Sequence, residues 1–572
     1  MTDAGDIREK ILSVVSENGG HLASSLGAVE IAMALADVFD AARDRIVWDV
    51  GHQAYAWKIL TGRSERFSTL RRLDGVSGFP SPAESPADAA VAGHAGTAIS
   101  VAAGFAAARD RKGTREHVVA VVGDGALVNG TSFEAINNCA AATSKVIVVL
   151  NDNEMSISRP SGSFSRFLGK LISGVRYNRV KAAAEQAGHR LRLTFLRGIY
   201  HRLESRIKSL FLGNAFFERF SLRYIGPVDG HDLAALKAAF TVAKEDKRSV
   251  LVHVVTRKGK GFAPAEREPT KWHGIGGFDR DTGALAPSAR DWSTAFGDIL
   301  CAAAEKDGRI VALTAGMKDG TGLAGFAGRF PGRFFDVGIA EGHMAAFAAG
   351  LAAGGMRPVV AVYSTFLQRA VDQIMHDVAI SKLPVVFCVD RAGVVGADGA
   401  THQGVFDIAM LRTLPNLVIC QPKDEADFAK LFAEALERDG PSVIRYPRGK
   451  IPSEVVCPPP GTAPLAIWAT GDWFPKACEI ARRLGGEAVH ARYLKPFDHD
   501  TLRRQRGEGK MIVSMENGAL AGGFGEAIGA DLKFGWPDEF IAHGTQAELE
   551  RRHGLDVEAM AAKTEEAMKA YG

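Results

Sequence analysis

The sequence predicts an α/β protein of three domains, in which helices cover mainly parallel sheets. Short apolar runs rich in β-branched residues alternate with helical patterns along most of the chain, which is typical of parallel strands buried on both faces. At 572 residues the chain is also too long for one hydrophobic core. Gly- and Pro-rich stretches interrupt the alternation, and we place the domains at residues 1–285, 290–452 and 460–572.

The composition is ordinary for a soluble globular protein, with 46% hydrophobic and 24% charged residues. A net charge of +3 gives no argument for nucleic acid as the main partner. The six cysteines are scattered without a CxxC pair, so we expect reduced, buried thiols in a cytoplasmic protein. The first ten residues lack the apolar core of a signal peptide, and the apolar segment 89–108 is too weak to predict a membrane span.

In the first domain we predict helices to about Glu17 and from about Ser25, a strand at 118–122, a helix at 131–142, and strands at 145–150 and 249–255. The strand at 118–122 ends in Gly-Asp-Gly, and the strand at 145–150 ends in Asn-Asp-Asn. Neighbouring parallel strands end at the same edge of a sheet, so Asp124 and Asn153 should lie close together. Their oxygens suit a hard cation that holds a phosphate. A tight turn is the structural alternative.

Three histidines in predicted loops precede the Gly-Asp-Gly turn: His21, His52 and His94. Each lies beside glycine, and histidine exchanges protons near neutral pH. A loop histidine taken alone is more often simply solvated. Three on loops that can converge favour a functional role.

The stretch 159–208 has a different character, with twelve Lys or Arg residues against two Glu. One hypothesis is a basic helix that binds a membrane surface or RNA. We favour a helical cover whose positive face is solvated or helps to attract anionic substrates, because the stretch lies inside an otherwise enzyme-like pattern.

The second domain contains predicted strands at 310–314, 334–337, 358–362, 385–389 and 443–446. Glu341 stands where the second of these meets an Ala-rich helix that runs through Ala353, in apolar surroundings. It could complement the helix dipole or carry out chemistry. The third domain shows no titratable cluster of its own.

Long sequence blocks, in one order, make the chain resemble the 1-deoxy-D-xylulose-5-phosphate synthase family of transketolase-like thiamine diphosphate enzymes. The resemblance is carried by WDVGHQAY (48–55), VVGDGA (121–126), LNDNEMSIS (150–158), YIGPVDGHD (224–232), KGKGFAPAE (258–266), YSTFLQRA (363–370), DRAGVVGADGATHQG (390–404) and RYPRG (445–449). It implies three transketolase-like α/β domains, with thiamine diphosphate between the first two, and a homodimer.

The resemblance also implies residue roles. Mg²⁺ would be held by Asp124, Asn153 and the backbone carbonyl of Met155. Glu341 would bond the aminopyrimidine nitrogen, because a carboxylate in a dry site stabilises the protonated ring. Phe366 would stack on that ring. The cofactor-binding set would be His52, Gly93, His94, Ala95, Gly125, Ala126, Asn153, Phe262, Glu341 and Phe366.

The implied reaction condenses pyruvate with glyceraldehyde 3-phosphate and releases CO₂, and the carbon chemistry belongs to the cofactor. Fixed arginines suit the acceptor's phosphate better than lysines do. The implied phosphate-binding residues are Tyr363, Arg391 and Arg448. The implied catalytic residues are Glu341, His21, His402, Asp398, Lys258 and His273.

The chain departs from the family pattern at several positions: Pro82 stands where a basic residue is usual, Gly342 replaces a glutamine, and the loop GHAGTAIS (93–100) lacks hydroxyls that are usual there. The first change is expected to remove a charge-assisted hydrogen bond of about 1.5–3 kcal/mol. A paralogous thiamine-dependent enzyme with another donor or acceptor is therefore an alternative hypothesis. A catalytically silent regulatory paralogue is a weaker one, because it has no physical need to keep Glu341, Asp124 and Asn153.

Overall fold

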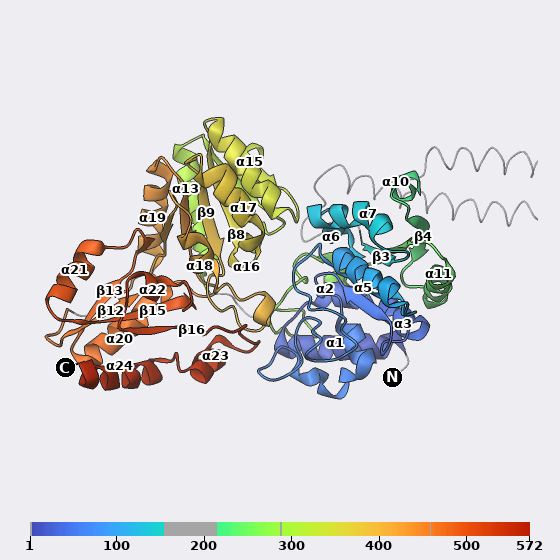
Figure 1. Cartoon of the computed structure of the whole chain (residues 1–572), viewed down its shortest axis with the longest axis horizontal. Coiled ribbons are helices and arrows are strands. Elements are labelled where there is room, and N and C mark those ends of the chain that lie inside the picture. Colours follow the sequence, from blue (N-terminus) through green and yellow to red (C-terminus); the bar gives the residue numbers. More distant parts are fainter. Residues whose placement is uncertain (1–2, 154–213, 286–288, 458, 572) are drawn as a thin grey trace, which may run out of the picture. The chain divides into compact units, whose positions relative to one another are not determined.

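The computed structural model describes residues 3–153, 214–285, 289–457 and 459–571. The chain forms two compact units, which we treat separately: Met1–Leu70 with Gly75–Ala286, and Arg71–Asp74 with Pro287–Gly572. Both are α/β, which confirms the predicted fold class (Figure 1). The predicted boundaries of three domains remain a prediction. The basic stretch 159–208 and the predicted ligand Met155 lie outside the described residues.

The first unit contains a five-stranded parallel sheet, which includes the three predicted strands of this region. Residues 119, 121, 147 and 149 alternate onto one face and pack against helices α1 (Ala4–Asn18), α3 (Val29–Val38) and α11 (Leu233–Glu245). Helices α5 (Ala98–Lys112) and α7 (Gly130–Ala142) pack against each other, and α5 also packs against strand β2 of this sheet (Figure 1). The strand order is β1 (Arg45–Trp48), β2 (Val118–Gly123), β3 (Ile147–Asp152), β5 (Val250–Val255) and β4 (Arg223–Asp229).

The second unit contains a seven-stranded sheet that is parallel except where β14 pairs with β10. Helix α15 (Glu341–Ala353) packs on one face, and α13 (Trp292–Lys306) and α19 (Glu425–Glu437) pack on the other. All five strands predicted here are confirmed, whereas β10 and β14 were not predicted. The order is β14 (Tyr493–Lys495), β10 (Val418–Cys420), β11 (Ser442–Arg445), β9 (Val386–Asp390), β8 (Arg357–Tyr363), β6 (Ile310–Thr314) and β7 (Phe334–Asp336).

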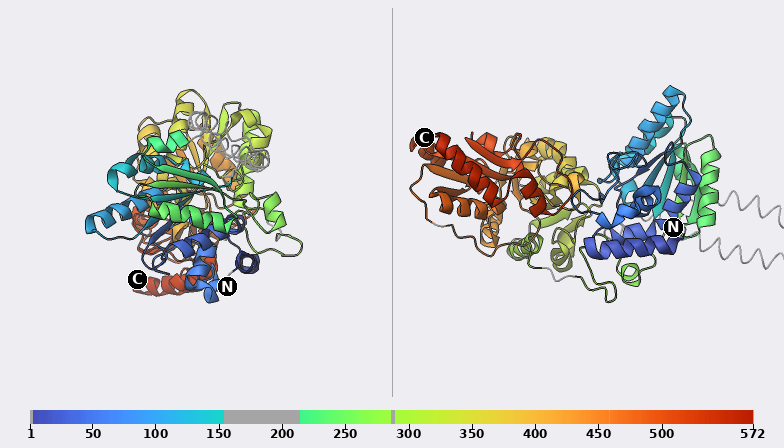
Figure 2. Two further views of the ribbon diagram at one scale, coloured as in Figure 1. Left: turned by 90° about the vertical axis from the view of Figure 1, so that its right-hand side faces the viewer. Right: turned by 90° about the horizontal axis from the view of Figure 1, so that it is seen from below.

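A four-stranded parallel sheet completes the second unit, in the order β13 (Glu487–His490), β12 (Leu465–Ala469), β15 (Met511–Ala519) and β16 (Leu532–Trp536). Helices α20 (Phe474–Leu484) and α24 (Val557–Tyr571) pack on one face; Figure 2 shows α24, in red, beside the C-terminus. On the other face Trp468 and Ile512 join the core of the seven-stranded sheet. The two sheets of this unit therefore share one hydrophobic core.

A buried polar network joins these two sheets, and residues 465–572 contribute to it together with Arg445 and Asp407 from the preceding part of the unit. Arg445, fully buried at the end of β11, donates to Asp407 at 2.9 and 3.0 Å and also to Asn517 of β15. Burial raises the pKa of Asp472 to about 6 and that of Glu516 to about 7. The network could not be predicted from the sequence, because its members come from separate helices and strands.

The structure also corrects the expectation that all six cysteines are reduced. Cys457 and Cys478 form a disulfide, with their Cα atoms 5.4 Å apart. Cys478 lies on α20, and Cys457 lies in the stretch before β12. The other four cysteines are free and buried, as predicted.

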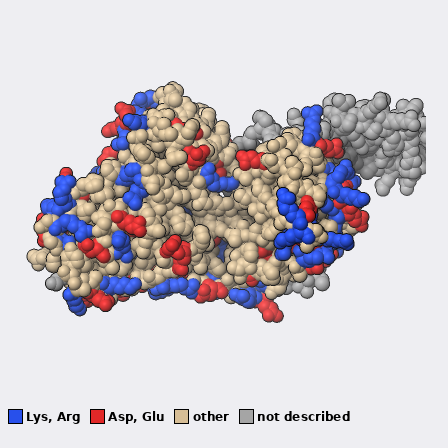
Figure 3. All heavy atoms as spheres, in the orientation of Figure 1, with Lys and Arg blue, Asp and Glu red and all other residues tan. Residues whose placement is uncertain are grey.

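Two surface properties bear on the predicted partners. Among the described residues, no helix is long and apolar enough to cross a membrane. On the face shown in Figure 3, basic and acidic side chains are interspersed over the described residues.

Candidate active site

The first unit places Asp124 and Asn153 at one edge of its sheet. Gly123 pairs with Asn151 across β2 and β3, so the residues that follow each strand lie level. Asp124 is the first residue of the short helix α6 (Asp124–Leu127) and is only 9% exposed. The strand ends predicted from the sequence are thereby brought together.

The electrostatics of this edge fit a bound cation. Burial and the nearby carboxylate of Asp152 together raise the pKa of Asp124 to about 7. Oδ1 of Asn153 is buried and has no hydrogen-bond partner among the described residues. A divalent ion would satisfy both groups, since carboxylate and amide oxygens are ligands that Mg²⁺ accepts. Among the described residues, no group of three or more His, Cys, Asp or Glu side chains could hold a metal ion.

The loop that holds Gly93, His94 and Ala95 is fixed by a buried carboxylate. Asp49 accepts hydrogen bonds from the backbone N–H groups of Gly96, at 2.8 Å, and Ala98, at 3.1 Å. The hydroxyl of Ser132 donates to the carbonyl oxygens of Gly96, at 3.2 Å, and Ala126, at 2.9 Å. These bonds hold the loop against α6, which carries Gly125 and Ala126. Asp49 and Ser132 were missed from the sequence, although Asp49 lies within the motif WDVGHQAY.

Three predicted histidines meet in the first unit. The rings of His21, His52 and His273 lie with centroids 6.2, 5.7 and 5.2 Å apart, although His273 is distant in sequence. Burial holds the pKa values of His52 and His273 well below the usual range, and the charge of Lys258 lowers both further. Both imidazoles are therefore neutral at neutral pH and can accept or donate hydrogen bonds.

Lys258 and Phe262 follow on the same loop, with different surroundings. Lys258 is buried, and burial lowers its pKa to about 8 although the carboxyl of Asp124 raises it. Lysine at such a pKa can exchange a proton near neutral pH. Phe262 packs against Trp272, with centroids 5.0 Å apart, and Phe278. This aromatic cluster accounts for Phe262 structurally, and its contact with a cofactor remains a prediction.

In the second unit Glu341 begins helix α15, as predicted, and is 4% exposed. Burial raises its pKa, while the guanidinium of Arg369, 3.7 Å away, opposes that shift. The adjacent Gly342 leaves space that Gln373 occupies, because a Cβ atom at residue 342 would lie 3.0 Å from Oε1 of Gln373. The departure at Gly342 therefore opens no void beside Glu341.

Tyr363 and Arg391 lie at the ends of neighbouring strands. Tyr363 pairs with Asp390 across β8 and β9, and Arg391 follows directly with a φ of +60°. The Arg391 guanidinium lies over the Tyr363 ring, 3.7 Å from its centroid, and donates to the carbonyl oxygen of Gly320 at 2.9 Å. Tyr363 also stacks on Phe366, with centroids 5.8 Å apart.

The remaining predicted residues of this unit surround that pair. His402 meets the ring of Phe366 edge-on, with centroids 5.5 Å apart. Asp398, in the same loop as His402, accepts a hydrogen bond from Nη1 of Arg71 at 2.6 Å. Arg448 follows β11; the residue reaches the surface, while protein atoms around its guanidinium still desolvate the group. Arg71 and Gly320 were not identified from the sequence, because nothing local distinguishes them from other arginines and glycines.

Pro82 lies in an exposed turn of the first unit, which ion pairs anchor. Glu84, two residues on, accepts from the buried Lys58 at 2.5 Å and from Arg63 at 2.9 Å. Arg63 also donates to Asp88. The turn is thus fixed, but residue 82 brings no charge to it.

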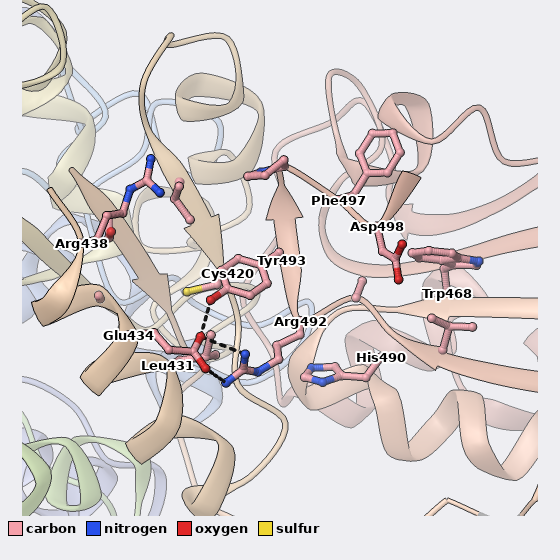
Figure 4. Close-up of a pocket in the computed structure, with 16 residues that line it drawn as sticks. Cys420, Leu431, Glu434, Arg438, Trp468, His490, Arg492, Tyr493, Phe497 and Asp498 are labelled. Carbon is pink, nitrogen blue, oxygen red and sulfur yellow. Dashed lines mark hydrogen bonds and ion pairs between the residues drawn. The ribbon is translucent and has the colours of Figure 1, made fainter. Parts of the chain in front are cut away.

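A pocket of about 560 Å³ lies in the second unit (Figure 4). The ion pair of Glu434 and Arg492, 2.9 Å between Nη1 and Oε2, lies on its wall, with Trp468 and Phe497 nearby. None of the predicted site residues lines this pocket. It is thus separate from the candidate site.

Comparison with known proteins identifies the family to which the chain belongs. A family model described as 1-deoxy-D-xylulose-5-phosphate synthase matches residues 2–256, and one for the pyrimidine-binding domain of transketolase matches residues 288–454. A 1-deoxy-D-xylulose-5-phosphate synthase of Syntrophotalea carbinolica is 47% identical, over 98% of this chain and 93% of its own. The chain belongs to the 1-deoxy-D-xylulose-5-phosphate synthase family.

Other relatives extend the same match and confirm the resemblance read from the sequence. 1-Deoxy-D-xylulose-5-phosphate synthase 2 of Geobacter sulfurreducens is 45% identical, over 98% of this chain and 95% of its own. The synthase of Nitratidesulfovibrio vulgaris is 45% identical, over 100% of this chain and 95% of its own. A solved transketolase from Leishmania mexicana is 20% identical, with coverage of 99% and 97% and a TM-score of 0.46. The family assignment therefore rests on the synthase relatives, which match at more than twice that identity.

Proposed function

We propose that this chain condenses pyruvate with D-glyceraldehyde 3-phosphate, with loss of CO₂, to give 1-deoxy-D-xylulose 5-phosphate. The observation that carries the proposal is its identity of 45–47% to synthases of that name over 98% of the chain. The product would serve as a precursor for isoprenoids, thiamine and pyridoxal. The chemistry of the site residues supports the assignment at each step below.

The proposed cofactors are thiamine diphosphate and Mg²⁺. Asp124 and Asn153, with the backbone carbonyl of Met155, would hold the metal and through it the diphosphate. Backbone groups of Gly125 and Ala126 would bind the diphosphate, with His52 and the loop of Gly93, His94 and Ala95 beside it. When bound, thiamine diphosphate supplies the carbon nucleophile and the electron sink for decarboxylation. The high pKa of Asp124 and the unpartnered oxygen of Asn153 support a cation at this edge.

Glu341 is the proposed residue that holds a proton on the aminopyrimidine ring. Its carboxylate would accept a hydrogen bond from the ring nitrogen, while Phe366 would support the face of the ring. In a dry site this charge-assisted bond is short and strong. The burial of Glu341 at the start of α15 supports this role, because a hydrogen bond to a charged group is stronger where water is excluded.

The polar residues of the first unit would orient pyruvate and move protons. Neutral His52 and His273, with His21, can donate to or accept from substrate oxygens without adding charge. Lys258, with a pKa of about 8, would be mostly protonated at neutral pH and could attract a carboxylate. His402 and Asp398 would supply polar contacts from the second unit.

The acceptor's phosphate would bind Arg391, Arg448 and Tyr363. Arg391 is already oriented by the Tyr363 ring and the Gly320 carbonyl, so little side-chain entropy is lost when an anion binds. Its planar fork suits two phosphate oxygens. Phosphorylated acceptors should therefore be preferred to neutral aldehydes.

Two further expectations are part of the proposal. A homodimer follows from the family resemblance, and light scattering of the purified protein would measure it. A cytoplasmic location also follows, and cell fractionation would test it. The Cys457–Cys478 disulfide makes this second test informative, because structural disulfides are rare in the cytoplasm of mesophiles.

The deciding experiment supplies purified protein with thiamine diphosphate, Mg²⁺ and pyruvate, with and without glyceraldehyde 3-phosphate. CO₂ release and product mass are followed. We expect release to be stimulated by the acceptor and accompanied by the five-carbon phosphate. Decarboxylation without that product would instead identify a paralogue with another acceptor. A protein that binds no cofactor would be a silent paralogue.

A further inference from the structure

Four residues of the N-terminal half of the chain, Arg71–Asp74, belong to the second unit. Arg71 and Asp74, at the two ends of this segment, have φ values of +65° and +59°. Residues other than glycine adopt such values at a cost of order 1 kcal/mol, and keep them only where their surroundings hold them. Contacts of the segment with its surroundings must therefore stabilise these two backbone conformations.

Two ion pairs hold the segment, one at each end. Asp74 pairs with Arg552 of helix α23 (Gln546–His553) at 3.0 Å, and both side chains are well exposed. Arg71 pairs with Asp398 at 2.6 Å, where the side chains are only 9% and 17% exposed. A pair exposed like the first contributes about 0–1 kcal/mol. The second is shielded from water and is electrostatically stronger.

The partner of Arg71 lies in the loop that carries His402. Asp398 stands between Gly396 and Gly399, and the backbone N–H of His402 donates to the carbonyl oxygen of Gly399 at 2.9 Å. Gln403 accepts from the backbone N–H of Gly396 at 3.2 Å. The loop is thus closed on itself, and a change in the direction of the Asp398 side chain needs no large movement of the backbone.

Asp398 faces more than one cation. Desolvation and the guanidiniums of Arg391 and Arg71 lower the pKa of Arg448, whereas the carboxylate of Asp398 raises it. Arg448, Arg391 and Arg71 therefore share one electrostatic neighbourhood with Asp398. The edge-on contact of His402 with Phe366, which stacks on Tyr363, also places the loop of Asp398 beside the Tyr363–Arg391 pair. The carboxylate of Asp398 would therefore act on the same guanidiniums as an anion bound there.

We propose that Arg71 is a positioning residue for the phosphorylated acceptor: it holds the Asp398 carboxylate by their ion pair and so keeps Asp398 from neutralising Arg448. Arg448 and Arg391 then present their guanidiniums to the phosphate. Arg71 also adds positive charge that favours a doubly charged anion over a neutral aldehyde. The inference rests on the proposed function, because it concerns the phosphate site of that reaction.

Steady-state kinetics separate this role from a purely structural one. Arg71→Met should raise KM for glyceraldehyde 3-phosphate about tenfold, which corresponds to about 1.4 kcal/mol. KM for pyruvate should change less than twofold, as should kcat/KM with unphosphorylated D-glyceraldehyde. Arg71→Lys, which keeps the charge, should recover most of the loss. Equal losses with both acceptors would overturn the proposal.

Arg552→Gln is the matched control, because it breaks the ion pair at the other end of the same segment. It should leave KM for glyceraldehyde 3-phosphate within twofold of wild type. If it reproduces the Arg71→Met effect, Arg71 only anchors the segment and the proposal fails.

A binding measurement keeps the test independent of turnover. Calorimetry with glycerol 3-phosphate, on protein loaded with thiamine diphosphate and Mg²⁺, should show weaker binding to Arg71→Met. Binding should recover in Arg71→Met/Asp398→Asn, which no longer has the competing carboxylate; absence of recovery would overturn the proposal. Asp398→Asn alone should bind at least as tightly as wild type, and weaker binding would contradict it even if Arg71→Met does not fold. Should wild type bind glycerol 3-phosphate but form no product, the proposed function fails while this inference is still tested.

Discussion

The guanidinium carbon of Arg391 lies 3.7 Å from the centroid of the Tyr363 ring, with Nη1 bonded to the carbonyl oxygen of Gly320. A cation over a tyrosine face at this distance gains about 0.5–2 kcal/mol, more where water is excluded. The parallel register of β8 and β9 brings the two residues level at the strand ends. A guanidinium held in this way is oriented before any anion arrives.

The first prediction concerns Gly320, whose missing side chain makes this contact possible. A Cβ atom there would overlap the Tyr363 hydroxyl, so Gly320→Ala must displace the ring and with it Arg391. We expect KM for glyceraldehyde 3-phosphate to rise about tenfold or more, with the thermal midpoint nearly unchanged. Gly325→Ala is the control, because a Cβ there meets nothing within 4 Å. Equal kinetics for the two variants would show that the Arg391–Tyr363 contact does not matter for the acceptor.

The second prediction concerns Glu341. Glu341→Gln keeps the shape of the buried side chain but removes the charge that stabilises a protonated aminopyrimidine. We expect exchange of the thiazolium C2 proton for deuterium, followed by NMR in bound thiamine diphosphate, to slow about 10²–10⁴-fold. Turnover should fall by a similar factor while cofactor affinity changes little. Exchange at the wild-type rate would refute the assigned role.

The third prediction is that Mg²⁺ binding depends on pH through Asp124. Its pKa of about 7 in the metal-free protein means that the carboxyl is protonated below pH 7 and must lose that proton to bind the cation. Affinity for Mg²⁺ should therefore weaken toward about tenfold per pH unit below 7 and level off above it. Titration of metal-free protein with Mg²⁺ from pH 5.5 to 8.5, followed by tryptophan fluorescence, measures this. Asp124→Asn should bind weakly at every pH, and a wild-type affinity that does not change with pH would contradict the prediction.

Much of the fold was predictable because buried parallel strands leave apolar runs that can be recognised locally. The strands that precede Asp124 and Glu341, and the strand that ends at Tyr363, were found in this way. The rule that parallel strands end at one edge placed Asp124 beside Asn153. Strand β10, with three residues, was not predicted, although β7 has the same length and was.

The residues that support the site could not be predicted from the sequence, for a different reason. Asp49 bonds a loop 47 residues away, and Arg71 pairs with a residue 327 positions along the chain. Neither contact follows from local periodicity, and an arginine or aspartate alone gives no sign of its partner. The Cys457–Cys478 disulfide was missed similarly, since a separation of 21 residues matches no motif.

The fourth prediction tests that disulfide. Mass spectrometry of unreduced peptides should find Cys457 joined to Cys478, with the other four thiols free. Closing a loop of this length stabilises a fold by about 2–4 kcal/mol, so a reductant should lower the thermal midpoint. That decrease should vanish in Cys457→Ser and persist in Cys301→Ser, the control at a free buried thiol. A wild-type midpoint that is insensitive to reductant would show that the disulfide adds no stability.

The fifth prediction concerns Arg445, which joins the two sheets of the second unit. Arg445→Met leaves the carboxylate of Asp407 buried without its bidentate partner and also removes the bond to Asn517. Removing one member of a buried pair costs about 3–5 kcal/mol, because the remaining charge stays desolvated. Urea denaturation should show that loss. Arg290→Met, which breaks a pair with Glu425 whose side chains are 45% and 32% exposed, should cost about 0–1 kcal/mol. Similar losses in the two variants would mean that water reaches the Arg445 network and that the two sheets are not joined by a dry polar core.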